Sequence, residues 1–224
     1  MRCLQILGGV LIAAWVANGL AVASAQGSQF SATSFPAAIT AEQEAGQTNQ
    51  FEVGGSSVKC STATFSATLA KARSTLTITP DYTGCTTSFG TEASVDNNGC
   101  DFVLHAGSAQ DESDDVFTGA ADLVCPAGQE LKLTLGLCTI DIPAQEELEG
   151  VTYTNKTEAS PHNVTVDLAL TAVELKVTNV FLCPLSVSTT TGSYQSKILV
   201  KGYEDLAGGK EGSGVGVTLK TFAP

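Results

Sequence analysis

The chain has 224 residues, of which 43% are hydrophobic and 15% charged, and its formal net charge at pH 7 is -12. Proteins that bind phosphate backbones or anionic lipid headgroups cluster Lys and Arg, so an acidic surface of this kind repels both. We therefore expect no nucleic acid partner.

The first 25 residues have the pattern of a cleavable signal peptide. Arg2 supplies the positive start, an apolar stretch follows from Leu4 to Val16, and small residues lead to Ala25. An uncleaved membrane anchor is the alternative, but Asn18 and Gly19 interrupt the apolar run, and a comfortable span needs about 20 apolar residues. We expect a helical signal peptide over residues 1–25 and a secreted, extracellular mature protein with no membrane span.

The next segment, residues 26–50, is rich in Ser, Thr, Ala and Gln and contains Pro36. This composition predicts an N-terminal arm, which Phe30 and Phe35 could pin to the core. Residues 51–224 then form the β domain, a length that buries one large core or two small ones. Pro143 marks a possible seam between two halves.

From Phe51 onward, hydrophobic residues alternate with polar ones, which buries one face of a strand and exposes the other. Turn signals such as Asn98-Gly99 separate the runs. We predict an all-β fold, an antiparallel β-sandwich or partly open barrel. Single helical turns are considered only at Thr64–Arg73 and Ala144–Leu148. The alternating stripes are Leu76–Tyr82, Leu131–Leu135, Cys138–Ile142, Val164–Leu170, Val173–Val177 and Val215–Leu219.

Six cysteines remain after removal of the signal peptide, and an even number in an exported chain predicts stabilising disulfides. The first two and the next two are each 25 positions apart, which favours pairing in sequential order, while the other pairings stay open. No CxxC pair occurs and the two histidines are distant in sequence, so we expect no zinc site. The cysteines are Cys60, Cys85, Cys100, Cys125, Cys138 and Cys183.

One acidic run contains weak candidates for calcium ligands: Asp111, Glu112, Asp114 and Asp115. Calcium takes six to eight oxygens, and carboxylates on one loop can supply several of them. The EF-hand spacing is absent, however, and a solvated loop between strands is the alternative. We assign no cofactor and no other metal site.

No catalytic residues can be assigned from motifs. The chain lacks G-x-S-x-G and HExxH, so a Ser-His-Asp site or a zincin has no support, and His105 is interpreted as a polar residue at a strand end. A glycosidase needs only two carboxylates, which sequence does not place in space. Loss of Trp15 with the signal peptide leaves four tyrosines, which weakens an aromatic-platform sugar site. Asn155 and Asn163 match the N-glycosylation pattern.

Several phrases resemble a family of uncharacterised secreted proteins from soil actinobacteria. The phrases are Val58–Phe65, Leu76–Tyr82 followed by Gly84-Cys85, Asn98-Gly99-Cys100 and Cys125–Gly128. The resemblance covers most of residues 51–202, and it implies export and a paired-cysteine β fold but no activity. The opening Cys60–Phe65 also resembles the secreted activator of alkane oxidation family over one short strand, in which Ser61 interrupts the phrase.

Export, disulfides, Thr-rich strands and missing catalytic motifs together indicate a non-enzymatic protein. We expect a surface, matrix or binding module with an unknown extracellular or cell-surface partner. One alternative is a secreted hydrolase that uses two carboxylates, and another is a calcium-dependent adhesive module built on the loop around Asp111. A pocket with two facing carboxylates would favour the hydrolase.

Overall fold

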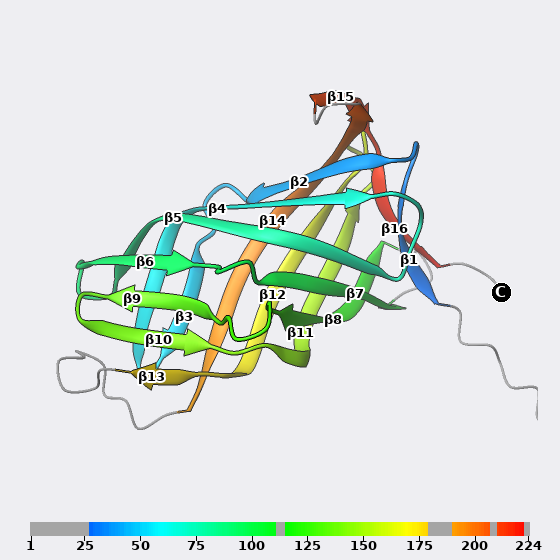
Figure 1. The fold of residues 1–224 in the computed structure, drawn as a ribbon. Helices are drawn as coiled ribbons and strands as arrows, with labels where there is room; N and C mark the ends of the chain where they lie inside the picture. Colours follow the sequence, from blue (N-terminus) through cyan, green and yellow to red (C-terminus); the bar gives the residue numbers. More distant parts are fainter. Residues whose placement is uncertain (1–26, 111–114, 179–189, 207–209, 222–224) are drawn as a thin grey trace, which may run out of the picture.

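The computed structural model describes residues 27–110, 115–178, 190–206 and 210–221, and these ranges contain sixteen β-strands and no helix that could span a membrane (Figure 1). The signal peptide prediction concerns residues outside these ranges. The first eight strands are β1 (Ser28–Ala32), β2 (Ala37–Gln43), β3 (Asn49–Val53), β4 (Ser56–Leu69), β5 (Thr75–Thr87), β6 (Glu92–Asp96), β7 (Asp101–Ala109) and β8 (Val116–Val124). The others are β9 (Leu131–Leu135), β10 (Cys138–Ile142), β11 (Gln145–Lys156), β12 (Asn163–Glu174), β13 (Lys176–Thr178), β14 (Thr191–Leu206), β15 (Lys210–Val215) and β16 (Val217–Thr221).

Eight of the strands form a closed, antiparallel, barrel-like sheet. Their hydrogen-bonded order is β5, β7, β8, β11, β12, β14, β2 and β4, and β4 pairs with β5 to complete the ring. Closure leaves these strands with partners on both sides over much of their length, so few backbone groups are unpaired. The predicted all-β antiparallel fold is confirmed, in its barrel-like form.

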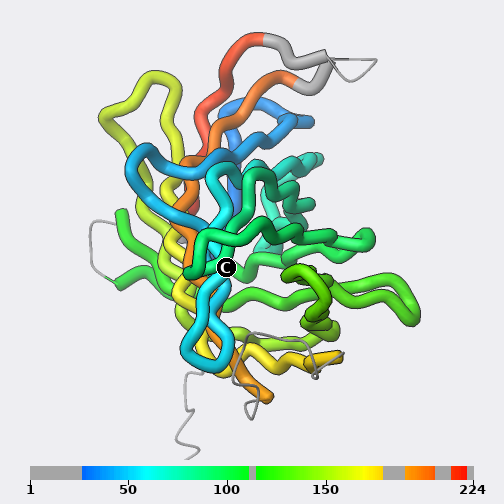
Figure 2. The backbone as a smooth tube through the Cα atoms, turned by 90° about the vertical axis from the view of Figure 1, so that its left-hand side faces the viewer, coloured from blue at the N-terminus to red at the C-terminus, as the bar shows by residue number. Residues whose placement is uncertain are grey.

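The long strands of the ring continue into a second set of pairings. The end of β5 pairs with β6, followed in order by β9, β10 and β13, while β3 pairs with both β4 and β14. Figure 2 shows the yellow strand β12 and the orange strand β14 side by side, with the light-green hairpin of β9 and β10 projecting away from them to the right. Hydrophobic side chains from both sets of strands fill one core.

The alternating stripes point into that core as predicted. Leu76, Ile78, Pro80 and Tyr82 of β5 are buried, while the residues between them are exposed. The same alternation buries one face of β9 and most of β12. Burial of apolar area on one face of each strand therefore fixes which residues remain on the outside.

Most of the segment expected to be an N-terminal arm forms strands instead. β1 pairs with β16 in a separate two-stranded sheet, and β2 lies between β14 and β4 in the main sheet. Ala37, Ile39 and Ala41 are buried, whereas Thr40 and Glu42 point outward. The period of two is present in the sequence, but small alanines make the hydrophobic stripe hard to recognise.

The two helical turns considered from composition are not formed. Thr64–Leu69 belong to β4 and Gln145–Leu148 to β11, because pairing with neighbouring strands overrides the helix propensity of Ala, Gln and Glu. Pro143 lies in the short connection between β10 and β11, and both strands belong to the same sheet order.

Two disulfides follow the predicted sequential order. Cys60 bonds Cys85, its direct partner across β4 and β5, and Cys100 bonds Cys125. Cys138 is also disulfide-bonded, and Cys183, its partner in the sequential scheme, lies outside the described residues. The first bridge therefore covalently fixes the pair of strands that closes the ring.

A hydrogen-bonded pair of tyrosines crosses the core between β5 and β14. The hydroxyl of Tyr82 donates to that of Tyr194 over 3.0 Å, and the Tyr194 hydroxyl donates to Oδ1 of Asn49 over 3.4 Å. The Tyr194 ring stacks on Phe102 at a centroid distance of 5.7 Å and an interplanar angle of 12°. Burial raises the pKa of Tyr82 well above its usual value and that of Tyr194 to about 12.

Removal of either described bridge should lower the free energy of unfolding by about 3 kcal/mol, because each joins residues 25 positions apart. The paired variants are Cys60→Ala with Cys85→Ala, and Cys100→Ala with Cys125→Ala. Denaturant titration of each variant against the unmodified protein measures the loss. Peptide mapping without reduction provides the control, and a peptide joining Cys85 to Cys100 would contradict the pairing.

The buried tyrosines should make the protein unstable in alkali. The unfolded chain releases their protons near pH 10, whereas the folded chain keeps them, so this contribution to stability is complete below about pH 10. It falls by about 1 kcal/mol per pH unit for each tyrosine as the pH rises toward 12. Denaturant titration between about pH 9 and 11 measures the slope.

The double variant Tyr82→Phe with Tyr194→Phe is the control for this effect. It should be less stable at neutral pH, because Asn49 loses a hydrogen-bond donor, but its stability should fall less steeply in alkali. Phenolate absorbance that shows Tyr82 ionising in the folded protein at pH 10 would contradict the burial argument.

Candidate functional site

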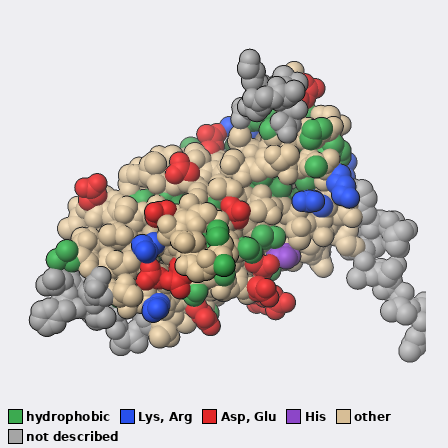
Figure 3. All heavy atoms as spheres, in the orientation of Figure 1, with side chains coloured by type: hydrophobic (Ala, Val, Ile, Leu, Met, Phe, Trp, Pro, Cys, Tyr) green, Lys and Arg blue, Asp and Glu red, His purple; other side chains and the backbone are tan. Residues whose placement is uncertain are grey.

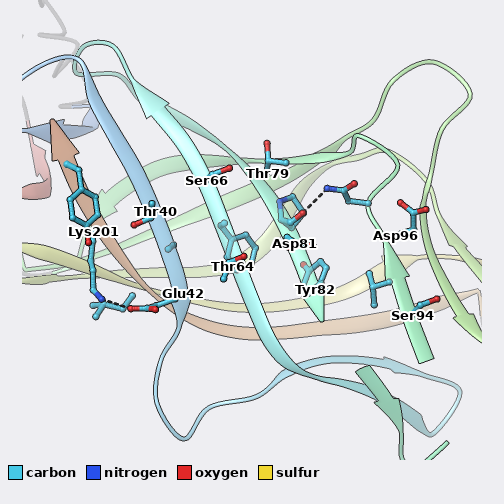
Figure 4. Close-up of a pocket in the computed structure, with 17 residues that line it drawn as sticks. Thr40, Glu42, Thr64, Ser66, Thr79, Asp81, Tyr82, Ser94, Asp96 and Lys201 are labelled. Carbon is cyan, nitrogen blue, oxygen red and sulfur yellow. Dashed lines mark hydrogen bonds and ion pairs between the residues drawn. The ribbon is translucent and has the colours of Figure 1, made fainter. Parts of the chain in front are cut away.

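A groove of about 800 Å³ lies on the outer face of β14, β2, β4 and β5, with β6 and the segment after it as a wall (Figure 4). We call it the outer-face groove. It lies where the solvent-facing positions of strands from distant parts of the chain come together. The polar side chains that line it are Thr40, Glu42, Thr64, Ser66, Thr79, Asp81, Ser94, Asp96, Asn97, Lys201 and Tyr203.

The register of the sheet arranges part of this lining in two rows that cross four strands. Residues directly opposite one another in an antiparallel pair point to the same face, so each row is continuous. The first row runs through Leu199, Glu42, Thr64 and Asp81. The second row, on the same strands, runs through Lys201, Thr40, Ser66 and Thr79.

A break in the pairing of β5 borders this floor. β7 pairs with β5 only up to Ile78, and β6 joins it at Cys85, so the stretch between them is paired with β4 alone. Pro80 has no N–H to donate and is tolerated at this open edge. Its carbonyl accepts a hydrogen bond of 2.7 Å from the Asn97 side chain, which holds the segment after β6 against the groove.

Charge is unevenly distributed along the groove. At one end Lys201 forms an ion pair with Glu42, and this contact raises the pKa of the Lys201 amine (Figure 4). At the other end lie Asp81 and Asp96. In the described part of the chain, the exposed side chain of Asp81 has no hydrogen bond or ion pair, while the side chain of Asp96 accepts one bond of 2.9 Å from the Asn98 backbone. The groove thus has a neutralised end and an acidic end.

Two carboxylates of the groove, Glu42 and Asp81, lie in the same row but in different surroundings. Glu42 and Asp81 stand two strands apart in one row, with Thr64 between them, which is roughly 10 Å by strand spacing. Inverting glycosidases use a comparable separation. A glycosidase acid, however, needs a desolvated carboxyl, and the Glu42 side chain is 59% exposed and bound to Lys201.

His105 contacts an aspartate on the neighbouring strand. It lies within β7, and its Nε2 is 2.7 Å from Oδ2 of Asp122 on β8. The other carboxylate oxygen of Asp122 accepts a 2.8 Å bond from the Glu147 backbone on β11. In the ranges that the structure covers, no serine or threonine hydroxyl bonds to His105. The pair therefore ties three strands together.

Most of the predicted calcium ligands are outside the described residues. These are Asp111, Glu112 and Asp114. Asp115 directly precedes β8, and its backbone carbonyl accepts a hydrogen bond of 2.8 Å from the Asn155 backbone. Among the residues that are described, no three His, Cys, Asp or Glu side chains are grouped to hold a metal ion.

The asparagines of the two glycosylation triplets lie at the start of β12 and the end of β11. Asn155 is 8% exposed, and its side chain both donates to and accepts from the Leu219 backbone at 2.9 Å. This amide holds β16 against β11, so a glycan on it would break that contact. The side-chain oxygen of Asn163 is buried and has no hydrogen-bond partner among the described residues.

The groove residues were not candidates from the sequence alone. Their sequence signal is weak, because each is simply a polar residue next to a hydrophobic one in an alternating strand. Thr79 and Asp81 are examples in β5. What makes them a site is the order of β14, β2, β4 and β5, whose sequence separations are long.

Comparison with known proteins gives no identity for the chain. No family model matches it, and neither a curated protein nor a solved structure does so. The likeness to secreted actinobacterial proteins stays a prediction.

Proposed function

We propose that this protein is an extracellular, non-enzymatic binding module that holds its ligand in the outer-face groove. The observation that carries the proposal is the pair of four-residue rows, which place hydroxyl and charged side chains side by side across four strands. Each hydroxyl of Thr40, Thr64 and Ser66 can both donate and accept a hydrogen bond. Such a floor suits a polar ligand with many hydrogen-bonding groups.

An extracellular location is supported by the covalent structure and by the sequence. Disulfides persist in oxidising compartments, and the two described here fit that environment. The signal peptide pattern at residues 1–25 points the same way. The acidic side chains scattered over the face in Figure 3 keep a secreted protein apart from other anionic surfaces.

A carboxylate-dependent hydrolase is the second candidate, and the spacing of Glu42 and Asp81 favours it. The exposure of Glu42 and its ion pair with Lys201 favour binding instead. Catalysis would require one of the two carboxyls to be held protonated near neutral pH, and burial is the usual means.

The test uses the labelled mature chain, residues 26–224, and washed cell envelopes of the source organism. We expect saturable binding that Ser66→Trp weakens at least tenfold, because the indole fills the middle of the groove. Thr68→Trp is the matched control: Thr68 is exposed on the same strand but does not line the groove, so binding should be retained.

Three outcomes contradict the proposal. Envelope binding could be absent, or it could survive Ser66→Trp unchanged, which would place the interaction elsewhere. The envelopes could also release soluble fragments with the unmodified protein but not with Glu42→Gln or Asp81→Asn. That third result would establish the hydrolase.

A further inference from the structure

We infer that the outer-face groove recognises a linear oligosaccharide with positively charged amino groups, lying across the strands with an amino group at Asp81 and Asp96. This inference rests on the proposed binding function and names the ligand class. Its three supports are the spacing of the polar rows, the distribution of charge and the poor fit of a peptide.

The spacing of the floor suits an extended sugar chain. Neighbouring strands in a sheet lie about 5 Å apart, which is close to the length of one sugar unit in an extended chain. A ligand crossing β14, β2, β4 and β5 would therefore meet a new polar side chain at each unit over roughly 15 Å. In the second row these are Lys201, Thr40, Ser66 and Thr79.

The groove hydroxyls differ in the hydrogen bonds that they can still form with such a ligand. Thr79 already donates a hydrogen bond of 2.6 Å to Oδ1 of Asp101, which leaves its lone pairs as acceptors. Thr64 and Ser66 are exposed at the centre of the floor, and Figure 4 shows them between the two charged ends. Sugar hydroxyls, which donate and accept equally, match this mixture.

The distribution of charge in the groove favours a positively charged ligand. Glu42 neutralises Lys201, so the groove has no uncompensated cation among the residues that line it. Asp81 is unpaired in the described residues, and Asp96 receives only a backbone N–H. A ligand amino group that pairs with either carboxylate forms an exposed ion pair worth up to about 1 kcal/mol. An acidic glycan meets repulsion from these carboxylates and from the acidic chain.

A peptide ligand fits this floor less well. Peptides that bind sheets add a strand to a free edge or place side chains in apolar pockets. β2 and β4 already have partners on both sides, and the open carbonyl of Pro80 is taken by Asn97. Leu199 is the apolar side chain of the two rows, so a peptide would gain little from burial there.

The experiment compares four probes by calorimetry, at low salt and a mildly acidic pH that keeps amino groups protonated. The probes are a β-linked glucosamine hexamer, its fully N-acetylated counterpart, a galacturonate hexamer and hexalysine. We expect the glucosamine hexamer to bind about tenfold more tightly than the N-acetylated one, and the galacturonate hexamer not to bind. Added salt should reduce the difference in affinity between the glucosamine hexamer and the N-acetylated hexamer, because salt screens the attraction between exposed charges.

The variant Asp81→Asn should reduce affinity for the glucosamine hexamer about fivefold and leave the N-acetylated hexamer unchanged. Asp167→Asn is the matched control, because Asp167 is an exposed aspartate of β12 that does not line the groove. Its affinity for both hexamers should equal that of the unmodified protein.

The outcomes separate this inference from the proposed function. Equal affinity for both hexamers, or no effect of Asp81→Asn, would overturn the amino preference while leaving a groove-binding module. Binding of hexalysine but of neither hexamer would show that charge alone is recognised and overturn the sugar class. Loss of envelope binding in Ser66→Trp would still support the proposed function in each of these cases.

Discussion

The pairing of β4 with β5 is the constraint on which the rest of the structure depends. Without it, the ring of eight strands would be an open sheet with two long free edges, which are sites of aggregation. The two strands are joined by a short turn, and the bridge between Cys60 and Cys85 fixes their register where β6 takes over from β7 as the neighbour of β5. A slip of either strand by one residue would turn its groove residue, Thr64 or Asp81, inward.

The same pairing explains why the groove lies where it does. β7 pairs with β5 up to Ile78 and β6 only from Cys85, so a stretch of β5 lacks a partner on this side, and Pro80 lies in that stretch. Asn97 supplies the missing hydrogen bond from a side chain and brings Asp96 to the rim. The unpaired stretch of β5 therefore borders the acidic wall of the candidate site.

The sequence predicted the fold better than the site, and the difference has a physical reason. Alternation of Leu76, Ile78 and Tyr82 with polar residues is a local property, so the strand and its buried face could be predicted. The equal cysteine spacings likewise indicated the two described bridges. The neighbours Lys201, Thr40 and Ser66 come from distant segments, and no local pattern encodes their register. The strand β2 was not predicted, because small alanine side chains make its hydrophobic stripe hard to recognise.

The core and the groove are also coupled through the tyrosine pair. Tyr82 is the inward neighbour of Asp81 on β5, and Tyr194 lies on β14, the strand that carries Lys201. Their hydroxyls meet across the interior, so the hydrogen bond links the strand at the acidic end of the groove to the strand at its neutralised end. A fully hydrogen-bonded buried network is rigid because breaking it leaves polar groups unsatisfied in a medium without water. A rigid floor lowers the entropy lost on binding, which matters most when each hydroxyl contact is weak.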